Sequence, residues 1–283
     1  MRTGRKEHVI LLIKGIMQVM KNKEKLLAIL VSATIVLVML MTGCEGLPDT
    51  GVEDLETEGF ISYAMTYYEA YGDEGPEALQ SAKFYYLLAI VTNNSDHLVK
   101  MAVLTPVAYD KDGNEIKNAF GFISFTDETM SKYKEDKAST VVEYIGAGDR
   151  ALAFGCFKLA DGIDEPARVE WKIDKVYTAT GDITSYVGIE SSVDEYGASY
   201  TITNNSDKDL ENVAAELLVV DTDGRFDPSG YQSFDYADEE TGEPETLAPG
   251  ESYEGYIDFA LYGIPHGEGS RAELFAKHYD TFN

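Results

Sequence analysis

Acidic and amide side chains at short spacing are the first feature of the sequence that could bind a metal ion. One such set follows an apolar run and has a shorter counterpart farther along: Asp110, Asp112, Asn114 and Glu115, then Asp221 and Asp223. An EF-hand calcium loop needs ligands at positions one, three and five, glycine at six and glutamate at twelve. Counted from Asp110, position six is Glu115, and Gly113 falls at position four. The spacing therefore favours a hairpin turn over a calcium site in both sets.

Nucleophilic and acid–base chemistry have little support in the sequence. Cys156 lies between Phe154 and Phe157 in a strand-like run, which favours a small buried core residue over a nucleophile. No G-x-S-x-G, S-x-x-K, H-E-x-x-H or phosphate-binding glycine loop is present. The histidines are dispersed along the chain: His8, His97, His266 and His278. We therefore predict a protein that is not an enzyme and holds no cofactor or metal. A hydrolase built from dispersed carboxylates and a calcium-dependent adhesin stay open as alternatives.

The composition further limits the classes of protein to which the chain could belong. The chain has 283 residues, of which 44% are apolar and 26% charged, so a large core is available and two domains are possible. Acidic residues outnumber basic ones 50 to 23, a net charge of -27, which excludes a general nucleic-acid binder because phosphates would be repelled. Two cysteines exclude a disulfide-rich scaffold and a zinc site with four thiolates.

The N-terminal part resembles a bacterial lipoprotein signal. Residues 26–41 form an apolar run of 16 residues, preceded by Lys21, Lys23 and Lys25. The run ends in Met41-Thr42-Gly43-Cys44, which resembles the lipobox. That resemblance implies cleavage between Gly43 and Cys44 and a diacylglycerol on the Cys44 thiol. The alternative is an uncleaved anchor helix with an incidental cysteine.

Either interpretation predicts a chain held outside the cytoplasm on a membrane tether. We expect residues 1–43 to be the signal peptide, with Met20 or Met17 as the true start, and residues 44–57 to be a flexible stalk. Without residues 1–43 the chain keeps 16 basic and 48 acidic residues, a net charge of -32. The expected partners are the membrane, through the lipid on Cys44, and an unknown protein or cell-wall partner.

Three blocks of sequence recur in the same order. They are 92–96 as 203–207, 110–113 as 221–224, and 145–149 as 247–251. The first two recur at one offset, 111 residues. The sequence therefore predicts two tandem copies of about 100 residues, with domain 1 over 58–178 and domain 2 over 182–283.

Each copy is predicted to be all-β. Residues 84–91 form a nearly continuous apolar run, and 60–71 are rich in Tyr, Phe and Ile. Two sets of apolar residues occupy alternate positions, which predicts strands with one buried and one wet face: Val169, Trp171 and Ile173, then Val213, Ala215, Leu217 and Val219. Asp112-Gly113 is typical of a type I′ hairpin turn. Helix is expected only as a turn or so near 74–81.

The order of these signals resembles a known family. A Tyr- or Phe-containing strand, Asn-Asn-Ser-Asp, an apolar strand, Asp-x-Asp-Gly and Ala-Pro-Gly-Glu are similar to the FxLYD-type and related immunoglobulin-like repeats of Gram-positive lipoproteins. The likeness covers about 60–171 and 186–275. The first copy departs from it at Gly146-Ala147-Gly148, and its Pro106 suggests an edge strand or a bulge. The resemblance implies two tandem immunoglobulin-like β-sandwiches after an N-terminal lipoprotein signal peptide, and it implies no catalytic residue.

Together these features predict a membrane-anchored, extracytoplasmic lipoprotein that acts as a non-catalytic binding or structural module at the cell surface. The acidic segment 235–245 is interpreted as a solvated loop, with a weak site for a cation or a basic partner as the alternative.

Overall fold

The computed structural model describes residues 54–71, 79–125, 133–178, 186–237, 245–267 and 269–278. With 59% strand and 5% helix the fold is all-β, as predicted. Gly43, Cys44, the expected signal peptide and residues 44–53 of the expected stalk lie outside the described residues, whereas residues 55–57 of that stalk belong to the strand Leu55–Ser62. Within the described segments, no helix is long and apolar enough to cross a membrane.

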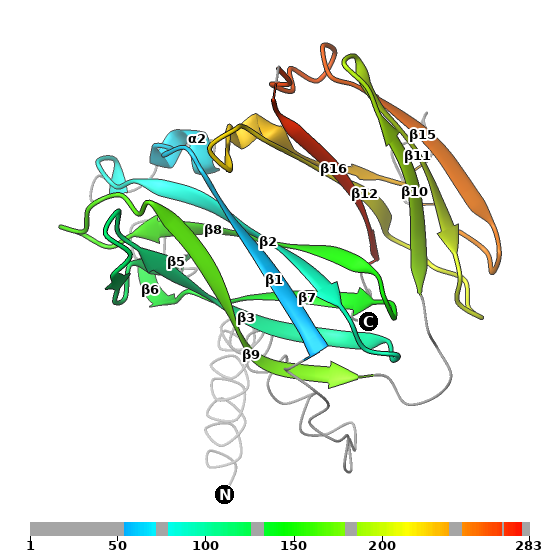
Figure 1. Cartoon of the computed structure of the whole chain (residues 1–283), viewed down its shortest axis with the longest axis horizontal. Helices are drawn as coiled ribbons and strands as arrows, with labels where there is room; N and C mark the ends of the chain where they lie inside the picture. The colour runs from blue at the N-terminus through cyan, green and yellow to red at the C-terminus, as the bar shows by residue number, and fades with distance from the viewer. Residues whose placement is uncertain are drawn as a thin grey trace, which may run out of the picture. The chain divides into compact units, whose positions relative to one another are not determined.

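Residues 54–178, here called the first half, form two sheets that enclose a core (Figure 1). The larger sheet has the order β13-β1-β2-β8-β5-β6, namely Arg225–Phe226, Leu55–Ser62, Phe84–Asn93, Arg150–Leu159, Phe120–Phe125 and Tyr133–Lys137. The facing sheet contains β4 (Glu115–Ile116), β3 (Val99–Tyr109), β7 (Thr140–Ile145) and β9 (Arg168–Thr178). Tyr85, Leu104 and Phe157 are among the side chains buried between the two sheets.

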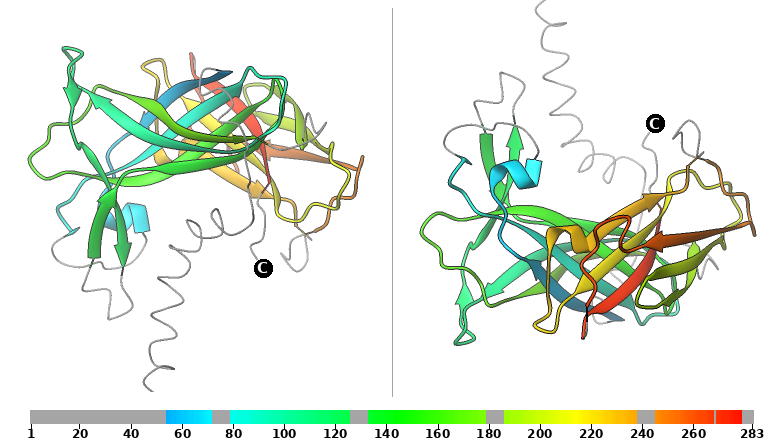
Figure 2. Two further views of the ribbon diagram at one scale, coloured as in Figure 1. Left: turned by 90° about the horizontal axis from the view of Figure 1, so that it is seen from below. Right: turned by 90° about the horizontal axis from the view of Figure 1, so that it is seen from above.

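Residues 186–278, the second half, also form two facing sheets, which can be followed in Figure 2. One contains β10 (Val187–Val193), β11 (Gly197–Asn204) and β15 (Ser252–Asp258) in that order. The other has the order β14-β12-β16, namely Tyr231–Asp235, Val213–Val220 and Arg271–His278, and a short 3-10 helix, η3 (Pro228–Gly230), precedes β14. Ile202, Leu217 and Ile257 are among the residues of the core between them.

The two halves share a third apolar cluster, here called the interface cluster. Its buried members come from β1, β2, β8, β12, β13 and β16: Phe60, Leu88, Ile90, Leu152, Leu218, Val220, Phe226 and Phe275. All eight residues of β12 are buried. The predicted wet face of this strand is therefore wrong, because the face opposite the second-half core is covered by the first half.

Backbone and polar contacts extend this junction. β13, which belongs to the second half in sequence, pairs in parallel with β1 through Ile61↔Arg225 and Ser62↔Phe226. Arg271 donates to both carboxylate oxygens of Glu58 over 2.9 and 2.8 Å. The second half thereby closes one edge of the larger first-half sheet.

The segment after β1 departs from the expectation of strand over 60–71. The strand ends at Ser62, and the helix α2 covers Tyr67–Tyr71. Thr66 and Glu69 form a capping box in which the Thr66 backbone N–H donates to Glu69 Oε2 over 2.7 Å and the Glu69 N–H donates to Thr66 Oγ1 over 3.3 Å. Residues 72–78, which contain most of the expected helical turn, lie outside the described residues.

The predicted hairpin at Asp112-Gly113 is confirmed, but its predicted turn type is wrong. Tyr109 pairs with Glu115 across the turn. Of the two central residues only Gly113 has a positive φ, 83°, whereas a type I′ turn needs positive φ at both. The loop is instead organised by the Asp110 side chain, whose Oδ1 accepts from the N–H groups of Asp112 and Asn114 over 2.9 and 2.8 Å.

Two smaller expectations about strands hold. In β9, Val169 and Trp171 are buried while Glu170 and Lys172 are exposed. Pro106 lies in β3 opposite Trp171 of β9, and on the other side of β3 the pairing with β7 ends at Leu104. Proline, which has no backbone N–H to donate, therefore lies in a stretch of β3 that does not pair with β7.

Candidate functional site

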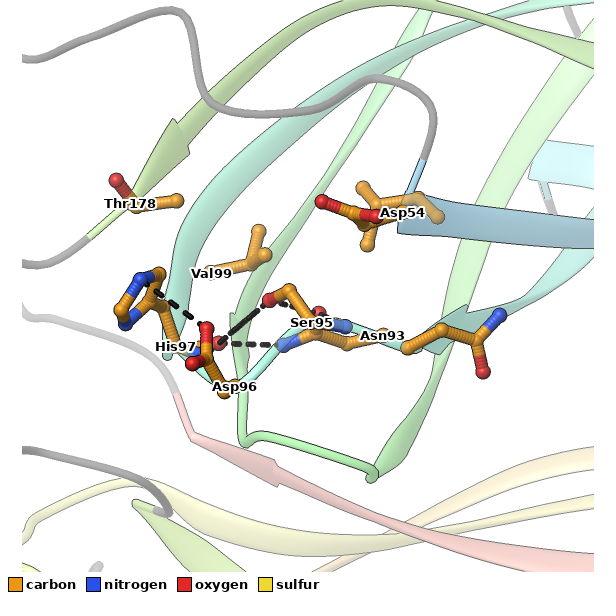
Figure 3. A pocket seen from close by; sticks show the side chains of 9 residues that line it. Asp54, Asn93, Ser95, Asp96, His97, Val99 and Thr178 are labelled. Carbon is orange, nitrogen blue, oxygen red and sulfur yellow. Dashed lines mark hydrogen bonds and ion pairs between the residues drawn. The ribbon is translucent and has the colours of Figure 1, made fainter.

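A pocket of about 520 Å³ opens at the end of β2, where three parts of the first half meet (Figure 3). The turn 93–99 between β2 and β3 supplies most of its wall. Asp54 and Leu55 come from the start of β1, and Thr178 comes from the end of β9. The recurring Asn-Asn-Ser-Asp block therefore lines a cavity as well as forming a turn.

Asn93 organises this turn from within. Its side chain is fully buried. Nδ2 donates to the carbonyl oxygens of His97, Ile145 and Gly146 over 2.7, 3.0 and 3.0 Å. Oδ1 accepts from the backbone N–H and the hydroxyl of Ser95 over 3.1 and 2.7 Å. The Asn93 amide thus ties the β2–β3 turn to the end of β7, and its hydrogen-bonding capacity is used by the fold.

Ser95, Asp96 and His97 are the residue types of an acyl-transfer triad and lie together in this pocket (Figure 3). His97 Nε2 is 3.1 Å from Asp96 Oδ1, and both side chains are largely exposed. The hydroxyl of Ser95, however, contacts Asn93 Oδ1 at 2.7 Å and the His97 carbonyl at 3.1 Å. A catalytic triad requires a hydrogen bond between the serine hydroxyl and the imidazole. This arrangement therefore holds a turn and activates no nucleophile.

The same set of contacts recurs at the second block. Asn204 Nδ2 donates to the Lys208 and Leu247 carbonyls over 2.7 and 2.8 Å. Ser206 donates through its N–H and its hydroxyl to Asn204 Oδ1 over 2.9 and 2.7 Å. Lys208 occupies the position that matches His97, and the hydrogen bonds around the asparagine are the same. The imidazole is therefore not needed for the geometry of this turn.

The acidic turns use their carboxylates internally. Asp110 Oδ1 and Asp221 Oδ1 each accept two backbone N–H groups, the latter from Asp223 and Arg225 over 2.9 Å in both cases. The hydrogen bond from the Asn114 side chain is the main cause that lowers the pKa of Asp110. Across the segments that the structure describes, no group of three or more His, Cys, Asp or Glu side chains could hold a metal ion.

Asp221 has a further contact that the sequence did not indicate. The hydroxyl of Tyr63, just after β1, donates to Asp221 Oδ2 over 2.6 Å. This bond joins the recurring acidic turn of the second half to the first half, beside the β1–β13 pairing.

A buried carboxylate on β12 was missed by the sequence reasoning. Glu216 is 1% exposed, and its Oε1 accepts from Lys277 Nζ over 2.6 Å and from the Tyr231 hydroxyl over 2.8 Å. Burial raises the pKa of Glu216, against the lowering effect of Lys277. The sequence indicated this buried carboxylate through a single charged residue, Glu216, inside the apolar run 213–220.

His278 lies at the other end of the junction between the halves. Its ring centroid is 5.3 Å from that of Tyr144 on β7 and 5.1 Å from that of Tyr186 at the start of the second half. The two tyrosine rings stack at 4.5 Å. Burial lowers the pKa of His278 to about 4. Aromatic packing around a neutral imidazole therefore forms part of the contact between the halves.

The remaining candidates are not gathered into one site. Cys156 on β8 packs against the core cluster of Met65 and Phe84, as predicted for a core residue, but it is only partly buried. His266 packs on Phe259 with the ring centroids 4.9 Å apart. Of the acidic segment 235–245, residues 238–244 lie outside the described residues, as do His8 and the lipidation residues Gly43 and Cys44.

Comparison with known proteins adds no relative from which a role could be transferred. The chain matches no protein-family model and none of the curated proteins against which it was compared.

Proposed function

We propose that the chain is a lipid-anchored extracytoplasmic lipoprotein whose two tandem immunoglobulin-like sandwiches act as a non-catalytic binding or structural module at the cell surface. The observation that carries the tandem arrangement is the matched pair of buried asparagines. Asn93 and Asn204 lie at equivalent ends of β2 and β11 and make corresponding bonds to the turn that follows. A duplicated module accounts for this identity of contacts.

The use of side chains in these turns supports a binding role over catalysis. Ser95 and Ser206 contact the same kind of amide oxygen at the same distance, 2.7 Å. The carboxylates of Asp110 and Asp221 accept backbone N–H groups. The residues with the most reactive side chains in the recurring blocks are therefore engaged in holding loops, and loops held by a rigid sandwich are common binding surfaces.

The lipobox-like Met41-Thr42-Gly43-Cys44 supports the anchor, and the interface cluster supports display of the two sandwiches as one unit. The acyl chains hold the protein at the membrane, and the strongly negative charge of the mature chain keeps its body away from anionic lipid headgroups. The carboxylate-based hydrolase and the calcium-dependent adhesin stay as alternatives, without a specific contact that favours either.

The anchor is tested by metabolic labelling with a clickable palmitate analogue in a bacterial host that processes lipoproteins. The chain offers a matched pair of variants, because its two cysteines are Cys44 and Cys156. We expect the native chain and Cys156→Ala to incorporate label and to fractionate with membranes, and Cys44→Ala to incorporate none. Equal labelling of Cys44→Ala and the native chain would remove the lipid anchor from the proposal.

A further inference from the structure

Equivalent strand edges are paired differently in the two halves. In the first half, both edges of the trio β1-β2-β8 are paired, by β13 on β1 and by β5 on β8. The equivalent trio of the second half is β10-β11-β15. Among the described residues, β15 pairs with β11 alone and no strand lies on its outer side (Figure 1).

The difference arises because one strand changes sheets. β5 begins at Phe120 and β14 begins at Tyr231, an offset of 111 residues, the same as between Asn93 and Asn204. β5 pairs with β8, through Phe120↔Leu159 and Gly121↔Lys158. β14 pairs instead with β12 in the other sheet. β5 thus covers the last two residues of β8, and the equivalent strand of the second half is used in the other sheet.

Side-chain exposure follows this change. Phe157 and Phe259 are equivalent and both buried. The leucine two residues farther on is 5% exposed in the first half, at Leu159, and 76% exposed in the second, at Leu261. Leu159 lies within β8 and pairs with Phe120, whereas Leu261 lies in the turn that follows β15 and is left in solvent.

Three exposed tyrosines lie near the C-terminal end of β15. Tyr196, Tyr256 and Tyr262 are 69%, 56% and 47% exposed. The Tyr196 carbonyl accepts from the Phe259 N–H over 3.0 Å, and the ring of Tyr256 lies across Gly197, where a Cβ would be 2.5 Å from its hydroxyl. Tyr262 packs edge-on against Phe234 of β14 at 5.0 Å. These three tyrosines and Leu261 are here called the β15 patch.

The charge around the β15 patch has one sign. β11, β15 and the β10–β11 turn carry four acidic residues and no lysine or arginine: Asp194, Glu195, Glu254 and Asp258. No lysine or arginine occurs between Arg225 and Arg271. A partner that is acidic would be repelled, and pairing of β15 with the β15 of a second copy would bring like charges together.

We propose that the β15 edge and the β15 patch bind an extended, lysine- or arginine-rich polypeptide segment of another protein, which adds to the sheet as its next strand. An open edge offers unpaired N–H and C=O groups for a main-chain ladder, and alternate side chains of the added strand meet one face. The cationic residues pair with the acidic rim and stack on the tyrosine rings, and the apolar residues cover Leu261. This inference rests on the proposed binding role and names the partner class.

The test uses the full lipidated chain in non-ionic detergent and a fluorescent nine-residue peptide of alternating Lys and Val. We expect this peptide to bind at physiological ionic strength, as measured by anisotropy. A peptide with Glu in place of Lys, and a Lys peptide with Pro in place of Val, are expected to bind at least about tenfold more weakly, because the first reverses the charge and the second cannot form the ladder. Hydrogen exchange is expected to show new protection in Ser252–Asp258 on binding.

Two exposed glutamates of the same sheet give a matched pair of variants. Glu254→Lys changes the charge on β15, and Glu190→Lys makes the same change on β10, the opposite edge, which lies close to β16. We expect Glu254→Lys to weaken binding about tenfold or more and Glu190→Lys less than about twofold. Leu261→Ser, which leaves the charge unchanged at an exposed position, is also expected to weaken binding.

Several results would overturn the proposal. Equal losses for Glu254→Lys and Glu190→Lys would show diffuse attraction, and equal binding of the proline peptide would exclude an added strand. A dimer of the chain that Glu254→Lys dissociates would assign the edge to a second copy. Binding of a neutral oligosaccharide that Tyr256→Ala removes, without peptide binding, would assign the tyrosines to a glycan. None of these results affects labelling at Cys44, so failure of this partner and failure of the anchor are distinguishable.

Discussion

Lys277 Nζ donates to Glu216 Oε1 over 2.6 Å at a place where the carboxylate is almost completely shielded from water. The two residues lie on paired strands as diagonal neighbours, since Lys277 of β16 pairs with Ala214 of β12 and Glu216 pairs with Phe275. The hydroxyl of Tyr231 shares the same oxygen, and in the described structure Oε2 of Glu216 has no hydrogen-bond partner. The negative charge of Glu216 is therefore balanced by one cation, and the fold depends on that cation remaining in place.

Removal of Lys277 is expected to destabilise the protein strongly. Lys277→Met leaves a buried carboxylate without its counter-charge, so we expect a loss of about 3 kcal/mol in the free energy of unfolding. The double variant Glu216→Leu with Lys277→Met is expected to recover most of that loss. Urea unfolding of the full chain in detergent measures both. Lys172→Met is the control, because Lys172 forms an exposed pair with Asp174; a similar loss there would contradict the explanation.

His278 predicts a dependence of stability on pH. Its pKa is lowered by burial to about 4, against an ordinary value of 6.5. Between these values the unfolded chain binds a proton that the folded chain does not, so stability falls as the pH decreases from 6.5 to about 4. The shift corresponds to about 3 kcal/mol at most.

The measurement compares unfolding of the native chain and His278→Phe at pH 7 and pH 4.5. We expect the native chain to lose more stability than the variant, whose ring still packs against Tyr144 and Tyr186 but does not titrate. His97→Gln serves as the control, since His97 is exposed in the turn. Parallel pH profiles for the native chain and His278→Phe would show that the imidazole titrates normally.

Asn93 and Asn204 are expected to be equivalent in their contribution to stability. Replacement of either by Ala leaves buried carbonyl groups without donors, which costs about 2 to 3 kcal/mol. Asn94→Ala changes an exposed neighbour and is expected to cost less than about 0.5 kcal/mol. Thermal unfolding monitored by circular dichroism compares the three variants. A large loss for Asn93→Ala alongside none for Asn204→Ala would argue against matched structural roles.

Cooperation between the halves can be measured through Trp171, which is the one tryptophan of the chain and lies in the first-half core. Leu217→Ala removes a fully buried side chain from the second-half core, at a cost of about 2 to 5 kcal/mol. Because the interface cluster joins the halves, we expect the urea midpoint reported by Trp171 fluorescence to decrease as well. An unchanged Trp171 midpoint, together with a biphasic circular dichroism curve, would show that the halves unfold independently.

The sequence predicted the strand-rich architecture because its main signals are local. The alternation in β9, the hairpin at Asp112-Gly113 and the polar turns after β2 and β11 depend on residues close together in the chain. The capping box at Thr66 and Glu69 was equally local, and its T-x-x-E pattern was available in the sequence.

The junction between the halves was not predicted, because it depends on residues far apart in the chain. Its sequence signal was present in the two runs that lack a polar face, 84–91 and 213–220, since a strand buried on both sides reads as continuously apolar. Nothing in either run indicated the other as its neighbour. The open edge of β15 was likewise hidden, because β5 and β14 follow similar turns and differ in the strand with which they pair.

The pairing of β13 with β1 has a consequence for fragments of this protein. A polypeptide that stops before Val187 lacks Arg225 and Phe226, so Ile61 and Ser62 lose their neighbours and the side chains of Phe60, Leu88 and Ile90 meet water. Such a fragment exposes an unpaired strand edge next to an apolar surface, and this combination promotes aggregation. We therefore expect premature termination between the halves to yield an aggregation-prone fragment.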